Sequence, residues 1–496
     1  MKFQSPIKQH FLRAYLSICL GFIGYALLVV APSPALAVSD IKLPLLGDSA
    51  SGIISKQQEY ELGRGWLKQF RSRVREHDDP LMQLYLEELL YNLATYSDIE
   101  DPRLELVIVN NASMNAFAVP GGVVGFHTGV FAFAENEDQM VSVLAHELAH
   151  LSQRHFARGV EEQRNSSIIN MAGLLTGLVI AATAGGDAGM AAITTAQALT
   201  MDGQLRYSRS NEQEADRLGL QTMERAKRDP AAAAGMFETL LRATRYNGRR
   251  VPEFLLTHPV TEKRIADARG RAMSNSMRHY RINPEFYLMQ ARALVAIASN
   301  PAKAIAGFEA KLRANTQQRE AANYGLALSY LNAGNYAKAR KILAALINKK
   351  PTELAFRHTN IELDIAEKDY GGALRKLNRL LLQNPDNYPL TRLKSEVLWQ
   401  AHSYEEAGHV LSTLSRKRSQ DPMIWYRLAE VRGLAGNISG VHQARAEYFI
   451  LVGGFDMARE QLTLAAKLVV ADFARSAIIR QRLRDVVAME DRLRKL

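Results

Sequence analysis

The stretch VLAHELAHLSQRH, residues 143–155, decides how this chain is interpreted. Apolar residues recur at helical spacing from 137 to about 158, which predicts one helix over this segment. His146 and His150 are four residues apart, so both imidazoles share a face and can reach one metal ion. Glu147 directly follows His146 on the helix, and its carboxylate is close enough to take a proton from a metal-activated water. The spacing indicates a zinc hydrolase site, because two imidazoles and one further protein ligand leave a coordination position open. The alternative is a chance match on a surface helix.

The third ligand is not expected within this stretch. A metzincin-type site would need glycine at position 153 and histidine at position 156, where this chain has Gln153 and Phe156. His155 stands five residues after His150, so we expect its side chain to point away from the metal. His155 is therefore interpreted as a structural or exposed residue.

A second segment, YSRSNEQEADRLG at 207–219, offers a carboxylate ligand. Glu212 and Asp216 lie four residues apart on one helix face, whereas Glu214 points elsewhere. Glu212 could bind zinc, and Asp216 could accept the N–H of a ligand histidine and fix its tautomer. Taken alone, the segment is equally well explained as the charged start of an ordinary helix.

The two motifs together resemble the gluzincin metallopeptidases of the CAAX-prenyl-endopeptidase family, which includes HtpX-type membrane proteases and mitochondrial Oma-type proteases. The resemblance implies a mainly α fold, with a gluzincin-type metalloprotease domain that contains a small β-sheet. It implies one Zn²⁺ per chain as cofactor. It also implies residue roles: metal ligands at His146, His150 and Glu212, the catalytic base at Glu147, and a supporting catalytic residue at Asp216.

A short β-rich region precedes the motif helix. LELVIV at 104–109 and MNAFAVPGGVVGFHTG at 114–129 predict two or three short strands joined by a Pro-Gly-Gly turn. In the resembling family, such a sheet presents an edge to which substrate adds as an extended strand, which implies substrate contact at Asn115 and Ala116. The alternative is a hairpin that only closes the core.

One further histidine gains meaning only from the resemblance. His258 precedes a proline in LLTHPVTEKRIADAR, residues 255–269, and by itself such a residue is usually on the surface. In the resembling family, a histidine in this context approaches the zinc and can fill its open position. The resemblance thus implies that His258 is a regulatory fourth metal ligand.

The second half of the chain carries an internal repeat. Ala339, Ala373 and Ala407 stand 34 residues apart, and Pro351 and Pro385 repeat the same interval, which is the tetratricopeptide period. A small residue there lets the second helix of each pair approach the first. We count four to five repeats, including a copy shifted by one residue and a degenerate last copy, and expect an α-solenoid whose concave face binds peptides or partner proteins. The alternative is an unrelated helical bundle.

The N-terminus has the features of a secretory signal peptide. Three cations precede an apolar run at 15–31, and Ala35-Leu36-Ala37 follows as a cleavage site, which places the mature start at Val38. The alternative is an uncleaved membrane anchor. Cys19, the only cysteine, lies in the apolar run, so the mature chain has neither thiol nor disulfide and suits an oxidising compartment such as a bacterial periplasm. We therefore divide the chain into a signal peptide (1–37), a zinc metalloprotease domain (38–283) and a tetratricopeptide-repeat domain (284–496).

Charge and hydropathy add two further expectations. The net charge is +11, and removing the three signal-peptide cations leaves 11 − 3 = +8, which permits attraction to anionic membrane surfaces or acidic partners. The lysines and arginines are scattered, which excludes a nucleic-acid-binding protein. Residues 168–184 are almost entirely apolar. We interpret them as part of a helical hairpin beside the active site, with a membrane-contacting element as the alternative.

These features lead to one functional interpretation and two rivals. The resemblance, the signal peptide and the repeats imply a zinc metalloendopeptidase of the periplasm that degrades misfolded or stalled outer-membrane proteins and assists their assembly. Its partners would be unfolded or misassembled protein substrates and, through the repeats, the outer-membrane β-barrel assembly machinery, with peripheral contact to the membrane. The rivals are a non-enzymatic tetratricopeptide assembly factor or chaperone with a closed metal site, and an integral membrane protease.

Overall fold

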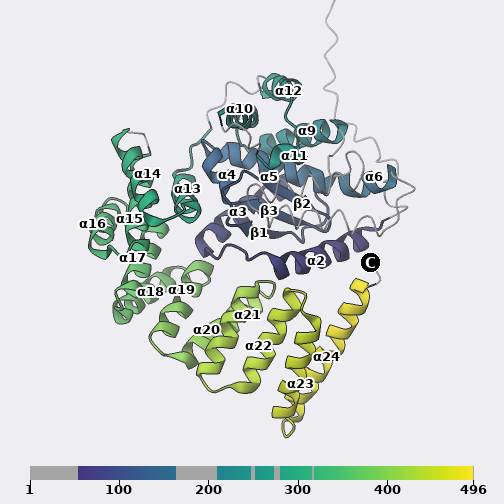
Figure 1. The fold of residues 1–496 in the computed structure, drawn as a ribbon, viewed down its shortest axis with the longest axis vertical. Coiled ribbons are helices and arrows are strands. Elements are labelled where there is room, and N and C mark those ends of the chain that lie inside the picture. The colour runs from purple at the N-terminus through teal and green to yellow at the C-terminus, as the bar shows by residue number, and fades with distance from the viewer. Residues whose placement is uncertain (1–53, 163–208, 247–251, 273–279, 315–317, 495–496) are drawn as a thin grey trace, which may run out of the picture. The chain divides into compact units, whose positions relative to one another are not determined.

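A three-stranded sheet lies between helices in the first half of the chain (Figure 1). The computed structural model describes residues 54–162, 209–246, 252–272, 280–314 and 318–494, so the expected signal peptide and the apolar run at 168–184 lie outside the described residues. Strand β3 is central: it pairs in parallel with β1 and antiparallel with β2. The strands span β1, Glu105–Val109; β2, Ala116–Val119; and β3, Val123–His127.

Both faces of this sheet are covered. Val107, Val109 and Phe117 pack against Trp66 and Phe70 of helix α2. The opposite face packs into the main core, with residues from helices α3 and α5. Burial on both faces explains why the strands are apolar throughout rather than alternating. These helices span α2, Lys56–Arg73; α3, Pro80–Tyr96; and α5, Glu137–Ser152.

Helix α5 ends earlier than the sequence predicted. Arg154 has a positive φ of 50°, the chain turns there, and a new helix, α6, begins at His155 and runs to Glu162. Arg154 donates to the carboxylate of Glu59 at 2.8 Å and to the carbonyl oxygen of Ile54 at 2.6 Å, which offsets the cost of its left-handed backbone. The prediction of one helix to about residue 158 was therefore wrong at its C-terminal end.

Short helix α4, Gly129–Phe133, follows β3, and four later helices complete the described first half and carry the rest of the site. Helix α9 packs closely along α5, and α10 packs against both α5 and α12. Short helix α11 ends at the residue before His258. The four span α9, Arg209–Arg225; α10, Ala231–Tyr246; α11, Phe254–Thr257; and α12, Glu262–Ala272.

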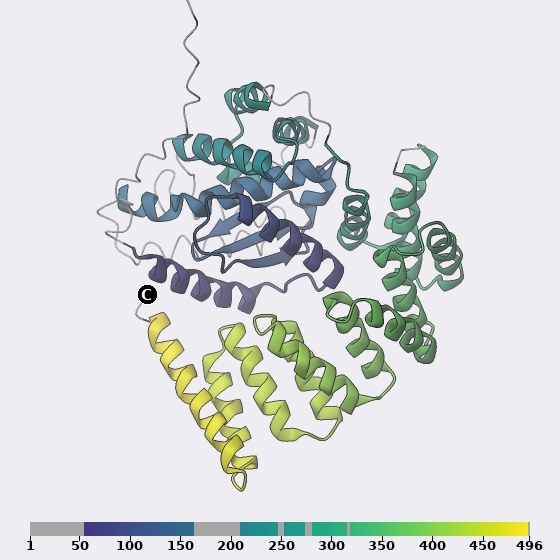
Figure 2. The same cartoon turned by 180° about the vertical axis from the view of Figure 1, so that it is seen from behind.

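The second half consists of consecutive helices that each pack against the next (Figure 2). Ala339, Ala373 and Ala407 are completely buried between paired helices, as their 34-residue interval predicted. Counted in pairs, the helices make six helix–turn–helix units over the described residues, more than the predicted four to five. The apolar positions at Trp425, Leu428 and Ala429 fit the first helix of a later repeat, but the alanine series stops there, because the next position is Val441.

The bounds of these helices follow the chain in order: α13, Pro284–Ile297; α14, Pro301–Arg313; α15, Arg319–Asn332; α16, Tyr336–Lys349; α17, Leu354–Ala366; α18, Tyr370–Gln383; α19, Tyr388–Gln400; α20, Tyr404–Lys417; α21, Pro422–Leu434; α22, Ile438–Leu451; α23, Phe455–Leu468; and α24, Phe473–Arg494. Within the described part of the chain, no helix combines the length and apolar character needed to cross a bilayer. The predicted boundary at 283/284 coincides with the start of α13, which Asn283 caps, and it stays a prediction.

A buried guanidinium ties the two halves together. Arg292 of α13 donates from Nε to Asp79 Oδ2 at 2.6 Å, at the start of α3. Its terminal nitrogens reach the hydroxyl of Tyr324 at 2.9 Å and, in the next repeat, Thr359 at 3.2 Å and Glu362 at 3.3 Å. Burial alone would raise the pKa of Asp79, but the charge of Arg292 outweighs it and lowers that pKa. The guanidinium therefore neutralises the buried carboxylate of Asp79, and it shares the partly buried carboxylate of Glu362 with His358, whose Nδ1 lies 3.4 Å from Glu362 Oε1.

We predict that Arg292→Met lowers the free energy of unfolding by about 3–5 kcal/mol at pH 7, since it leaves the buried Asp79 without its cation and leaves Glu362 with His358 alone. Without that cation both carboxyl pKa values rise, so the folded variant takes up protons that the unfolded chain does not hold. The loss should thus be largest at neutral pH and smaller near pH 5. Urea unfolding at both pH values measures it.

The matched control is Arg313→Met on neighbouring α14. Arg313 is exposed, and among the described residues its ion pair is a 4.0 Å contact with Glu309, so its removal should change stability by less than about 0.5 kcal/mol. Equal effects of the two substitutions, or a loss at Arg292 that does not depend on pH, would contradict the assigned role.

Candidate metal centre and active site

The close packing of α9 on α5 creates the site. Gly219 of α9 faces the backbone of α5 so closely that an added Cβ would lie 3.2 Å from His146 N and 3.3 Å from Ala145 C. This close approach brings Glu212, which lies in the first turn of α9, beside His146 and His150. All three side chains are buried. Two packed helices, rather than one helix, therefore bring these three side chains together.

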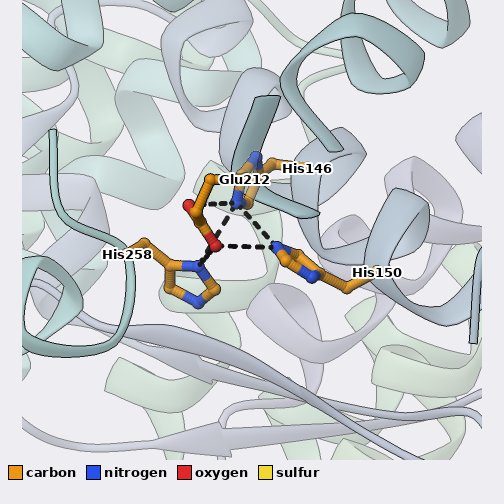
Figure 3. Close-up of side chains that lie close together, drawn as sticks. All are labelled: His146, His150, Glu212 and His258. Carbon is orange, nitrogen blue, oxygen red and sulfur yellow. Dashed lines mark hydrogen bonds and ion pairs between the residues drawn. The ribbon is translucent and has the colours of Figure 1, made fainter. Parts of the chain in front are cut away.

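Four side chains converge on a single point (Figure 3). His146, His150, Glu212 and His258 each offer one ligand atom, and these atoms all lie within 4.8 Å of one another. The Nε2 atoms of His146 and His150 are 3.0 Å apart. Glu212 Oε1 lies 3.4 Å from His150 Nε2, and Oε2 lies 3.5 Å from His146 Nε2.

The donor set fits a divalent metal ion. Two or three imidazole nitrogens with one carboxylate oxygen form the mixed set that zinc and related ions take in proteins. Burial of every donor also suits a metal, because buried ionisable groups need a counter-charge. His146, His150 and Glu212 could hold the ion, with His258 as a fourth donor.

His258 reaches the cluster from a short loop. Its Nδ1 lies 2.9 Å from Glu212 Oε1 and 3.3 Å from His146 Nε2. The loop holds it there: His258 N donates to Phe254 O at 2.8 Å, and the Phe254 ring lies beside the imidazole with centroids 4.7 Å apart. A surface position, the alternative that the sequence left open, is excluded, because His258 is buried.

Asp216 and Arg264 orient the cluster from behind. Asp216 Oδ1 lies 3.0 Å from His146 Nδ1, on the side of the ring away from the cluster. Arg264 of α12 donates to both carboxylate oxygens of Asp216, from Nε at 2.6 Å and from Nη2 at 2.7 Å. Its Nη1 lies 2.8 Å from Glu212 Oε2. Burial alone would lower the pKa of His146, but the hydrogen bonds with Asp216 and Glu212 raise it to about 9. Sequence reasoning missed Arg264, which lies 48 residues from Asp216 with no spacing to connect them.

Glu147 lies beside the cluster and next to the sheet. It is completely buried, and its Oε1 lies 3.6 Å from His258 Nε2. Burial raises its pKa, against the opposing charges of His258 and His146 and the backbone N–H of Ala118. Since Ala118 belongs to β2, the carboxylate of Glu147 lies between the cluster of candidate metal ligands and that strand.

Strand β2 lies at the edge of the sheet, as the sequence reasoning expected for this region. Ala116 is its first residue and is buried. Asn115 precedes it; the carbonyl oxygen of Asn115 accepts from His127 N at 3.0 Å, and its side chain points to Glu253, 3.4 Å away. The structure thus places both residues on or beside the edge strand, and substrate contact there stays a prediction.

His155 lies closer to the site than predicted. Its Nδ1 is 2.8 Å from Nδ1 of His150, and its Nε2 is 3.1 Å from the Glu214 carboxylate. Burial lowers the pKa of His155 to about 4, so it is neutral at physiological pH. The expectation that it points away was wrong because the turn at Arg154 brings the chain back; the structural role was the better of the two interpretations.

Comparison with known proteins agrees with this geometry. The profile of Peptidase family M48 matches residues 80–272, and a tetratricopeptide-repeat profile matches residues 364–431. The chain is 34% identical over 442 residues to the beta-barrel assembly-enhancing protease of Escherichia coli strain K12, across 88% of this chain and 89% of that protein.

Two other relatives extend the comparison. A putative beta-barrel assembly-enhancing protease of Vibrio cholerae is 32% identical over 450 residues, across 89% of this chain and 92% of that protein. The mitochondrial metalloendopeptidase OMA1 of Schizosaccharomyces pombe is 33% identical over 193 residues, across 37% of this chain and half of that protein. The expected resemblance and the fold class are confirmed.

We predict that the purified chain carries a divalent metal ion and that Glu212→Gln lowers its affinity by more than about 100-fold, because the amide cannot replace the carboxylate charge. Elemental analysis and competition with a chelator measure both. Glu224→Gln, about three turns further along α9, is the matched control and should keep its metal. Equal metal content in all three proteins would remove Glu212 from the site.

Proposed function

The chain belongs to peptidase family M48, among metalloendopeptidases of the β-barrel assembly-enhancing type, and on that premise we propose that it is a zinc-dependent endopeptidase of the bacterial periplasm. The observation that carries this proposal is the buried convergence of His146, His150 and Glu212 beside Glu147. We assign the three as ligands of one zinc ion and Glu147 as the general base.

The residues around that ion would each have a separate role in peptide-bond hydrolysis. Zinc, when bound, would act as a Lewis acid that polarises the scissile carbonyl and lowers the pKa of water, so that the water can lose a proton and attack near neutral pH. Glu147 accepts the proton of the attacking water and passes it to the leaving amine. Asp216 accepts the N–H of His146 Nδ1 and, with Arg264, keeps the imidazole turned toward the cluster.

Substrate would reach Glu147 along strand β2. The far edge of this strand is unpaired among the strands of the described sheet, so an extended peptide can add to it through backbone hydrogen bonds. Ala118 lies against Glu147, so a strand added there passes the catalytic carboxylate. Recognition of backbone suits a protease that acts on unfolded or misassembled chains of varied sequence. We assign Asn115 and Ala116 to this binding edge.

His258 is proposed to control access. Its Nδ1 lies among the ligand atoms, so it would fill the coordination position that a water and a scissile carbonyl need. Its Nε2 also faces Glu147 at 3.6 Å. The enzyme would thus rest in a closed state, and the His258 loop would have to withdraw before cleavage.

The wider role follows from the relatives and the repeats. A beta-barrel assembly-enhancing protease is similar to this chain over nearly its whole length, which supports a function in the quality control of misfolded or stalled outer-membrane proteins. Tetratricopeptide helices form a protein-docking surface, so we assign contact with the outer-membrane β-barrel assembly machinery to this half. Assisted assembly of intact barrels would use the same docking.

Glu147→Gln should abolish proteolysis while keeping the metal. Removing a general base costs about 10²–10⁴ in rate, and the amide preserves the shape of the buried side chain. Cleavage of an unfolded outer-membrane protein, with metal content determined in parallel, measures the loss. Full activity, or full complementation of a deletion strain by the variant, would point to the non-enzymatic role instead.

His258→Ala should raise proteolysis by about fivefold or more, if the closed state costs ~1 kcal/mol or more to open. The readout is kcat/KM on the same unfolded substrate, with metal content measured in parallel. His402→Ala, at a turn in the repeat half, is the matched control and should leave activity unchanged. A variant that retains metal without gaining activity would show that His258 does not close the site.

A further inference from the structure

The turn between the last two helices exposes an unusual amount of apolar surface. Phe473 is 81% exposed, Val470 76%, Ile478 67% and Leu468 55%. These residues lie within eleven positions of the chain, at the end of α23, in the turn and at the start of α24. Figures 1 and 2 both show this turn at the lower end of the α23–α24 pair, away from the C-terminus.

An exposed apolar turn is the opposite of what the end of a repeat array needs for solubility. Terminal helices of a solenoid normally carry a polar outer face, because no further repeat covers them. Here α24 buries Ile479 and Val486 against α22 and α23, so its packing face is satisfied. The apolar residues of the turn are additional to that core, and they therefore need another explanation than repeat packing.

Cations surround the exposed apolar residues. Lys467, Arg475 and Arg480 are exposed on either side of the turn, and the segment between them has a single acid, Asp472, which lies 3.3 Å from Arg475. Large apolar side chains at a tip with a rim of lysine and arginine are typical of proteins that rest on anionic bilayers, where the side chains enter the acyl boundary and the cations meet phosphate.

We propose that the α23–α24 turn, residues 467–480, is a membrane anchor that inserts peripherally into the surface of a bilayer containing anionic lipid. Phe473 and Val470 supply the most exposed apolar groups. Arg475 and Arg480 supply attraction to lipid phosphate. No residue of the metal centre lies in the turn, so this proposal stands independently of the proposed peptidase function.

The observations favour a lipid surface over a protein partner. A second copy would bring the same cations against this rim, and a partner protein would need an apolar groove bordered by acidic residues, whereas an anionic headgroup layer matches both features. The basic net charge of the whole chain, +11, acts in the same direction.

The test is co-sedimentation with vesicles. The chain from Val38 is used, because the apolar run at 15–31 would bind vesicles itself and residues 50–496 form one compact unit with their own core. We expect binding to phosphatidylethanolamine vesicles that contain phosphatidylglycerol, and little binding to phosphatidylcholine alone. Binding should weaken as salt rises from about 0.05 to 0.5 M, as electrostatic attraction requires.

Two variants and one control locate the contact. Phe473→Ser should lower the vesicle partition coefficient by about tenfold, and Arg475→Gln with Arg480→Gln by roughly tenfold at low salt. Leu382→Ser removes a side chain that is equally exposed, 83%, but on α18, and should bind like the parent protein. No binding by the parent, or equal losses at Phe473 and Leu382, would overturn the proposal.

A spectroscopic readout separates insertion from adsorption. The chain from Val38 contains no cysteine, so Val470→Cys can carry a single environment-sensitive dye, with Leu382→Cys as its control. We expect a blue shift and gain of emission with anionic vesicles only for the label at 470. If neither label responds, or if sedimentation velocity shows that Phe473→Ser breaks a dimer of a parent that ignores vesicles, the turn is not a membrane anchor.

Discussion

The carboxylate of Glu212 is the point on which the site depends. Three imidazoles and a guanidinium face it, and they come from α5, from the loop after α11 and from α12. Burial alone would raise its pKa, yet these partners, with His258 the strongest, lower it far below its usual range. The ionised carboxylate of Glu212 holds the facing imidazoles and guanidinium in place, because burying any of these charged or polar groups without a partner would cost free energy. The packing of α5, α9, α11 and α12 is thus coupled to the chemistry of one side chain.

Sequence patterns could predict the parts of this site that share a helix. Spacing of four residues places His146 with His150 and Glu212 with Asp216, since each pair lies on one helical face. It could not show that the two pairs meet, which depends on Gly219 and tertiary packing. The family resemblance supplied that link. Arg264 had no such signal, because its partners are distant in sequence and its role is to orient other groups.

The predictions that the structure corrected also failed for physical reasons that local sequence patterns do not contain. Periodicity alone extends α5 past Ser152, since no glycine or proline stops it; the turn depends on the contacts of Arg154 with α2. The repeat period predicted the buried alanines of α16, α18 and α20, but the series breaks at Val441 of α22, where a larger residue fills the position. Local rules thus fail where long-range contacts decide the backbone or where packing tolerates a substitution.

The loop that carries His258 is attached to the same stretch that leads into the edge strand. Phe254 N donates to Met114 O at 3.2 Å, and Glu253 faces Asn115. By contrast, His146 and His150 belong to a helix buried along most of its length. His146 and His150 therefore lie on a long buried helix, whereas His258 directly follows the four-residue helix α11, which is hydrogen-bonded to the residue stretch before the edge strand. Under the proposed closed state, the fold would separate the residues that keep their geometry from the residue that moves, and it would place His258 beside the strand to which substrate is proposed to add.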